Sequence, residues 1–315
     1  MMKQLWEASH KDKMSIQSLK HSDYVTTTTE KLAKTFKNFN SNVKILRNMF
    51  DWELPQWNLN IDDVRKEMLP EWFPTQDKVI IGWAGLTSHF EDLRRMHEII
   101  KAVHDKYPNT YFVLAGMALK DTQVEIQYDE NGKPMFKEME IKDESLLYKN
   151  RVKNLYSDID PNRIKIFDAL GLEEYSKFYC LFDISLAYIE HNAFNSCKSE
   201  IKVVESIHYN CIPVFSEFGG YHDFWRNVPQ QIKRNNCAIS LTSPRHWSEA
   251  IGYWVENINQ ENTRNFVRQL KTHSDDSYDL NKNVEQRLLF YLEEIEKHEE
   301  NQINQIATYT EYSGV

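Results

Sequence analysis

A short polar segment near the middle of the chain carries the side chains best suited to chemistry. Lys198 stands directly before Ser199, and Lys202 and Glu205 follow at helical spacing. Ser199 is a residue type that commonly caps a helix, so a helix is expected to begin near Glu200. Free N–H groups and the dipole at such a helix end favour a bound phosphate, and Lys198 adds a positive charge. A carboxylate further along the helix offers acceptors for sugar hydroxyls.

Two buried strands are expected to position this segment. Apolar runs at 184–189 and 212–215 predict the strands, and the short polar residues of 191–197 predict a loop after the first of them. A loop that leaves a strand and enters a helix in this way is a common anion site. A capped helix whose charges are merely solvated fits the same spacing, so spacing alone leaves both interpretations open.

The same segment carries a longer pattern. Residues 192–205 read N-x-F-N-x-x-K-S-x-x-K-x-x-E, and I-P-V follows at 212–214. This pattern resembles the donor-binding segment of GT-B glycosyltransferases, most closely the retaining family 4 type with its phage and bacterial members. The resemblance implies catalytic roles for two residues: Lys198 at the donor phosphates and Glu205 at the ribose. It also implies the following donor contacts in this segment: Asn192, Asn195, Ser199 and Lys202.

Two features depart from the family pattern. The family often has a second glutamate, which contacts the transferred sugar, and Cys197 occupies that position here. The interval from Glu205 to Pro213 is one residue longer than usual, which places an extra residue near Asn210. Both departures bear on the identity of the donor and on activity.

Another loop is expected at the same edge of the sheet. The apolar strand at 78–84 leads into residues 85–90, which the family places against the donor phosphate. Gly85, Thr87 and His89 are therefore candidate donor contacts, although a loop histidine is more often a plain surface residue. The family commonly has an arginine near this loop, and none is present here, so Lys198 would carry most of the phosphate charge.

Strands and helices alternate from residue 78 to 241, which predicts an α/β fold with a doubly wound parallel sheet. Ligands bind such sheets beyond the carboxyl ends of the strands. Gly219 and Gly220 follow the strand at 212–215 at this edge, where glycine lets the backbone approach a ligand or turn sharply. The resemblance implies that residues 78–280 form the Rossmann-like, nucleotide-sugar-binding domain of a GT-B enzyme.

The remaining segments are expected to flank this domain. Residues 1–50 resemble the closing part of a GT-B amino-terminal domain, most of which is expected to be missing. Residues 51–77 are rich in Trp, Pro and acidic residues and predict a linker. Residues 117–147 depart from the family and predict an inserted β-hairpin. Residues 281–315 predict a long helix and a polar tail.

Composition argues against several classes of protein. A net charge of −9 disfavours broad nucleic-acid binding through phosphate neutralisation. The four cysteines form no C-x-x-C pair, so neither zinc nor a disulfide framework is expected, and free thiols fit a cytoplasmic protein. No apolar run is long enough to span a membrane. Asp158-Ile159-Asp160 resembles a metal-binding pair, but it precedes the strand at 163–167, away from the expected site, and predicts a turn.

These observations together predict a glycosyltransferase that uses a UDP- or GDP-type nucleotide-sugar donor. The resemblance implies a retaining reaction that needs neither a metal nor a cofactor. The acceptor stays open as a glycan, a lipid-linked sugar or a modified base, and an oligomer or a partner would supply the acceptor site. A non-catalytic binding or assembly module is an alternative, because Cys197 stands at a glutamate position of the family and the acceptor domain is expected to be incomplete. A phage enzyme that glycosylates DNA bases is a weaker alternative.

Overall fold

The chain folds around one parallel β-sheet. The computed structural model describes residues 11–117, 123–128, 134–139, 144–240 and 242–313, with the side chains of 13–86, 88–117, 148–240, 242–285 and 287–300. The sheet has the strand order β10–β9–β8–β3–β4–β7, and all neighbouring strands are parallel. The bounds are β3 (Val79–Ala84), β4 (Thr110–Ala115), β7 (Ile164–Phe167), β8 (Ile184–Ala187), β9 (Ile212–Ser216) and β10 (Ala238–Ile239). The predicted doubly wound sheet is thus confirmed.

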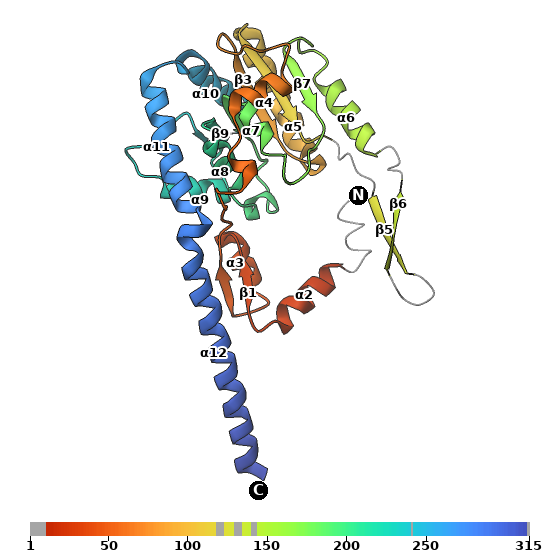
Figure 1. Cartoon of the computed structure of the whole chain (residues 1–315), viewed down its shortest axis with the longest axis vertical. Helices are drawn as coiled ribbons and strands as arrows, with labels where there is room; N and C mark the ends of the chain where they lie inside the picture. The colour runs from red at the N-terminus through yellow and green to blue at the C-terminus, as the bar shows by residue number, and fades with distance from the viewer. Residues whose placement is uncertain (1–10, 118–122, 129–133, 140–143, 241, 314–315) are drawn as a thin grey trace.

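Helices cover both faces of this sheet (Figure 1). The crossovers of parallel strands are right-handed, so α5 (Phe90–Lys106), between β3 and β4, and α8 (Ile201–His208), between β8 and β9, lie on opposite faces. Helix α10 (Pro244–Asn257) packs against α5, and α11 (Glu261–Tyr278) packs against α8. The strands are continuous apolar runs because both faces are buried, and Trp83, Phe112 and Phe215 are almost inaccessible.

The carboxyl ends of the strands meet at one edge of the sheet. Helix α6 (Glu144–Leu155) precedes β7, and α7 (Lys177–Leu181) joins β7 to β8 on the return crossover. Helix α9 (Gly220–Asn227) begins directly after the loop that follows β9. The loops that leave β3, β8 and β9 therefore emerge beside one another, where a doubly wound sheet binds its ligand.

The N-terminal piece, residues 11–50, is a small α/β unit beside the sheet. It contains α2 (Lys11–His21), β1 (Val25–Thr27), α3 (Glu30–Phe36) and β2 (Val43–Ile45). β1 and β2 pair in parallel as a separate two-stranded sheet. Thr29 begins α3 because its side chain accepts a hydrogen bond from the Leu32 N–H.

Residues 51–77 contain more regular structure than a linker. They form a 3₁₀ turn η1 (Pro55–Trp57) and helix α4 (Ile61–Met68), which the sequence analysis did not predict. Asn60 caps α4 by accepting a hydrogen bond from the Asp63 N–H. The apolar pattern of α4 is too short to stand out among the surrounding Trp, Pro and acidic residues.

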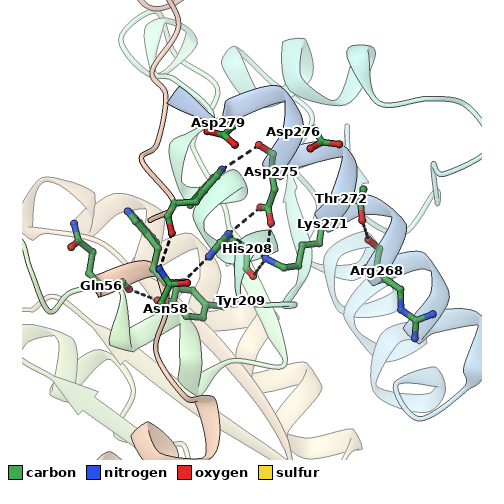
Figure 2. Close-up of polar contacts among 12 residues, drawn as sticks. Gln56, Asn58, His208, Tyr209, Arg268, Lys271, Thr272, Asp275, Asp276 and Asp279 are labelled. Atoms are coloured by element: carbon green, nitrogen blue, oxygen red, sulfur yellow. Dashed lines mark hydrogen bonds and ion pairs between the residues drawn. The ribbon is translucent and has the colours of Figure 1, made fainter. Parts of the chain in front are cut away.

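A polar cluster anchors this segment to α8 and α11 (Figure 2). The His208 imidazole bonds with the Trp57 carbonyl at 2.8 Å and lies 3.0 Å from the Asp275 carboxylate. Lys271 Nζ donates to the other oxygen of Asp275 at 2.7 Å. The Trp52 ring stacks on His208 with a centroid distance of 4.1 Å. The tryptophans of this segment therefore serve packing.

Two elements stand apart from the sheet in Figure 1. β5 (Gln123–Tyr128) and β6 (Pro134–Met139) pair antiparallel, which confirms the strands of the predicted hairpin, while its turn lies outside the described residues. Helix α12 (Leu280–Ser313) runs past the N-terminal piece and continues beyond it. No helix in the described ranges is both long enough and apolar enough to cross a membrane.

Candidate functional site

Three of the predicted site residues converge at the carboxyl edge of the sheet. Nζ of Lys198 lies 3.5 Å from Nε2 of His89, and Nζ of Lys202 lies 3.4 Å from the same nitrogen. His89 comes from η2 (Thr87–His89), after β3, whereas the lysines come from the loop and helix that follow β8. The fold thus brings together residues more than a hundred positions apart.

A buried aspartate orients His89. Oδ2 of Asp92 accepts from Nδ1 of His89 at 2.6 Å, and Oδ1 of Asp92 accepts from the Glu190 N–H at 2.9 Å. Burial lowers the pKa of His89, the hydrogen bond to Asp92 opposes this, and the charges of Lys202 and Lys198 lower it further. The imidazole is therefore neutral near pH 7, with Nε2 turned toward the two lysines.

The two lysines are cations without a matching carboxylate. In the described part of the chain, neither Lys198 nor Lys202 forms an ion pair. Burial lowers the pKa of Lys198, and burial together with the charge of Lys198 lowers the pKa of Lys202 to about 8, although the charge of Asp92 opposes both shifts and that of Glu205 opposes the second. An anion placed between these ammonium groups would relieve their desolvation and their mutual repulsion.

Gly85 makes room for Lys202. The ammonium of Lys202 lies over the Trp83 ring, 4.9 Å from its centroid. A Cβ atom at position 85 would lie 2.7 Å from Lys202 Nζ and 2.6 Å from Trp83. Gly116, which ends the next strand with a φ of +91°, leaves space for the Gly85 carbonyl. The observed role of Gly85 is to leave this space, and its predicted donor contact stays a prediction. The side chain of Thr87, also predicted as a donor contact, lies outside the described residues.

The two asparagines shape the loop after β8. The buried Asn195 side chain donates to the Glu190 carbonyl at 2.8 Å. The side chain of Asn192 accepts from the Asn195 N–H, also at 2.8 Å. Both predicted residues therefore lie in the loop that presents Lys198, and their observed contacts hold its backbone.

The predicted cap at Ser199 is wrong. Helix α8 begins at Ile201 with Glu200 in the cap position, and no side chain caps it. The Ser199 hydroxyl instead accepts from the Asn48 side chain at 3.2 Å. The sequence pattern led to the wrong prediction because the partner of Ser199 is Asn48, which lies about 150 positions away and is not revealed by local spacing.

The N-terminal piece touches this segment at three positions on either side of Lys198, namely Cys197, Ser199 and Glu200. The Thr29 hydroxyl donates to the Cys197 carbonyl at 3.2 Å. The Asn48 side chain donates to the Ser199 hydroxyl, as described above. The Glu200 carboxylate lies 3.8 Å from the Arg47 guanidinium. The backbone around Lys198 is thus held from outside the domain that carries it.

Gly219 and Gly220 support the loop from the other side. A Cβ atom on Gly220 would lie 2.5 Å from the Lys198 carbonyl, and one on Gly219 would lie 3.1 Å from the Ser196 carbonyl. Gly219 also has a φ of +58°, which disfavours other residues. Both glycines thus make room for the loop that carries Lys198, and the predicted approach to a ligand stays a prediction.

Glu205, predicted as the ribose contact, is almost fully buried. Its carboxylate is 4% exposed and accepts from the Tyr175 hydroxyl at 2.6 Å and the Tyr179 hydroxyl at 2.7 Å. Burial raises the pKa of Glu205 to about 7, against the effects of the two hydrogen bonds and of Lys202. The ribose contact stays a prediction, because both oxygens already have protein partners here.

Sequence reasoning missed three participants: Asp92, Trp83 and Tyr175. Asp92 had a usable signal, since it follows His89 by three residues at the start of a helix, a spacing that brings side chains together. The other two gave no signal, because the topology alone places them beside Lys202 and Glu205.

The D-x-D pair lies where the sequence analysis expected it. Asp160 accepts from the Asn162 N–H at 2.9 Å and so closes the turn before β7. Asp158 lies 2.8 Å from His97. In the described residues, no group of three or more His, Cys, Asp or Glu side chains is arranged to hold a metal ion.

Two cavities lie at the opposite edge of the sheet. Their volumes are about 300 and 410 Å³, and both are lined by Asp183 and Ile258. Neither includes Lys198, Lys202 or His89. The cavities therefore lie at one edge of the sheet and the converging lysines at the other. We place the candidate site at the lysines, because an anion is bound by cations that have no other partner.

Comparison with known proteins reveals a shared fold. No family model and no curated protein matches the sequence. The Anabaena Alr3699/HepE structure with UDP and glucose has a TM-score of 0.60, 13% identity, and covers 91% of this chain and 68% of that chain. A Rickettsia africae ESF-5 glycosyltransferase has a TM-score of 0.60 and 15% identity over 86% of this chain and 63% of that one.

A plant enzyme extends the comparison. The catalytic domain of Arabidopsis thaliana starch synthase IV, bound to ADP and acarbose, has a TM-score of 0.59 and 11% identity over 90% of this chain and 58% of that one. The chain thus spans about two thirds of the length of these structures. At such identities the likeness shows the fold, which is that of GT-B glycosyltransferases with their Rossmann-like sheet.

Proposed function

We propose that the chain is a glycosyltransferase of the family 4 type that binds the diphosphate of a nucleotide-sugar donor. The convergence of Lys198, Lys202 and His89, with no carboxylate of the described residues paired to either lysine, carries this proposal. Partly buried cations favour a bound anion, because an unpaired charge away from water costs free energy. The likeness in fold to proteins that hold UDP or ADP supports a nucleoside diphosphate.

The proposed reaction releases the nucleoside diphosphate from the sugar. Negative charge develops on the phosphate oxygen as the glycosidic bond breaks, and the ammonium groups of Lys198 and Lys202 stabilise it. The first N–H groups of α8 point to the same edge of the sheet and add to this effect. Because the lysines supply positive charge at the leaving group, we propose a metal-independent reaction, with retention of configuration by family resemblance.

Glu205 is proposed to receive the ribose hydroxyls of a UDP or GDP donor. Its carboxylate has four lone-pair positions, of which Tyr175 and Tyr179 use two. Tyr175 is only partly buried and lies in the segment after β7, at the same edge as the lysines. A ribose would therefore reach Glu205 when the Tyr175 hydroxyl turns aside.

A non-catalytic binding module is the second candidate, and Cys197 favours it. Its thiol lies 3.5 Å from the Ala193 carbonyl, at the position where the family often has the glutamate that contacts the transferred sugar. A thiol does not accept several hydrogen bonds from a sugar as a carboxylate does. Such a protein would bind the nucleotide without turnover, and the acceptor, whether glycan, lipid-linked sugar or modified base, stays open for the enzyme.

Binding and turnover measured on one preparation test both candidates. We expect calorimetry to detect at least one of UDP, GDP and ADP, and to detect no binding of the matching uncharged nucleoside. Transfer or hydrolysis of the corresponding nucleotide sugars should follow for the enzyme. Binding without any turnover supports the module, and absence of binding for all three diphosphates contradicts the site itself.

Diphosphate binding should also take up protons near pH 8. The pKa of Lys202 is about 8 in the free protein, so about half of the molecules carry an uncharged amine at that pH. A bound anion raises this pKa, and the affinity should therefore fall as the pH rises through 8. Calorimetry in two buffers with different ionisation enthalpies measures the uptake.

Lys202→Met is the control for this measurement. The variant removes the titrating group at similar length, so proton uptake at pH 8 should largely vanish. Equal uptake in both proteins would assign the protons to other groups, and Lys202 would lose its proposed place beside the phosphate.

A further inference from the structure

Helix α12 exposes an apolar stripe, which we define as Val284, Leu288, Tyr291, Leu292 and Ile295. These side chains are between 46% and 57% exposed. At 3.6 residues per turn, all five lie on one third of the helix circumference. Scattered exposed apolar residues are normal, but a contiguous row of this length marks an interaction surface.

The N-terminal piece covers the neighbouring face of α12 and leaves the stripe open. Phe290 is 8% exposed and meets the ring of Tyr24 edge to face at a centroid distance of 5.3 Å. Nζ of Lys44 lies 5.3 Å from the centroid of the same ring. The stripe begins about one quarter-turn from Phe290 around the helix. Figure 1 shows α12 continuing past the N-terminal piece.

The spacing of the stripe fits another helix. Val284, Leu288, Tyr291 and Ile295 follow one another at intervals of four, three and four residues. This is the spacing of the apolar seam along which two helices pair in a coiled coil.

The part of α12 that carries the stripe is acidic, and the N-terminal piece beside it is basic. Residues 285–300 contain six glutamates and two basic residues, a net charge of −4. The N-terminal piece contains eight basic and three acidic residues, a net charge of +5. In a chain of net charge −9, such a basic unit is exceptional, and it lies beside the same helix.

Much of this charge has no ion-pair partner among the residues that the structure describes. Lys31 and Lys34 on α3 and Lys37 at its C-cap are exposed and form no ion pair with any residue that the structure describes. The same holds for three exposed glutamates of α12, namely Glu293, Glu296 and Glu300, within the described ranges. Both sets are therefore available to a partner.

We propose that a second copy of this chain covers the stripe, with the two α12 helices antiparallel. In this arrangement the acidic half of each α12 lies toward the N-terminal piece of the other copy, and the interface is the same on both sides. Parallel pairing would place the two acidic halves side by side, where like charges repel. The proposal does not depend on the function of the donor site.

The stripe itself is tested by the mass of the full chain in solution. Light scattering during gel filtration should give twice the 37.5 kDa of one chain. The variant Leu288→Glu/Ile295→Glu should give one chain mass with an unchanged circular dichroism spectrum, because both side chains are already exposed. Leu172→Glu, at a residue that is 80% exposed elsewhere, should leave the dimer intact. A monomeric wild type would overturn the proposal.

Charge reversal tests the antiparallel arrangement. One variant carries Glu293→Lys, Glu296→Lys and Glu300→Lys, and the other carries Lys31→Glu, Lys34→Glu and Lys37→Glu. Each alone should be monomeric, because like charges then face each other twice across the interface. An equimolar mixture should restore a dimer that contains one copy of each. A mixture that stays monomeric means that these charges do not meet between chains, and the arrangement is then wrong.

Discussion

Replacing Asp183 with alanine should lower the free energy of unfolding by about 3 kcal/mol, because it leaves a largely buried guanidinium without its counterion. Asp183 Oδ1 accepts from Nη2 of Arg65 at 2.8 Å, and Oδ2 accepts from the Ile80 N–H at 2.7 Å. Arg65 also donates from Nε to the Cys180 carbonyl. One carboxylate thus joins α4 to the beginning of the sheet, and urea unfolding measures the loss.

Asp77 provides the matched control. Its carboxylate pairs with Lys78 at 2.9 Å, but the Asp77 side chain is 82% exposed. Water screens such an exposed ion pair, so Asp77→Ala should change the stability little. Similar losses for the two alanine variants would show that the Arg65 pair is no more important than a surface pair.

The Lys198→Ala variant should reduce donor turnover by about 100-fold in kcat/KM, since one preorganised donor at a developing oxyanion is worth about this factor. The loss follows from the position of its ammonium, 3.5 Å from His89 and free of any described carboxylate. Affinity for the nucleoside diphosphate should fall with it, because the proposed function places the lysine beside the phosphate both before and after transfer. Steady-state kinetics and calorimetry measure the two effects.

Lys101→Ala controls for the loss of one positive charge from the chain. Lys101 lies on α5, where it pairs with Asp105, and it has no contact with the candidate site. Its substitution should leave kcat/KM within about twofold, as expected for a remote surface charge. If Lys198→Ala behaves like Lys101→Ala, the phosphate is bound elsewhere.

The sheet was predictable because its signal is local. Each buried strand is an apolar run bounded by turn residues, as in 79–84, and alternation with helices indicates a parallel sheet. The convergence of Lys198 and His89 was also within reach, because both follow strands at the same edge. Helix α4 was missed since its few apolar residues lie among tryptophans and prolines that suggest a linker.

The finer geometry of the site was not predictable, because it depends on contacts between distant segments. Ser199 has the sequence environment of a cap, but Asn48 takes its hydroxyl. Glu205 has the spacing of a ribose ligand, but Tyr175 and Tyr179 both donate to it in this structure. In each case the residue type was informative, and the partner was set by tertiary packing.

The three bonds from Thr29, Asn48 and Arg47 to residues 197–200 couple two parts of the chain that sequence reasoning treats as separate. A segment held in this way opens cooperatively with whatever holds it. The backbone on either side of Lys198 and the small unit at the chain's beginning then share one local unfolding equilibrium. Ligand binding at Lys198 would therefore slow amide exchange in β1 and β2 as well, because the ligand would make the shared opening of both segments less favourable.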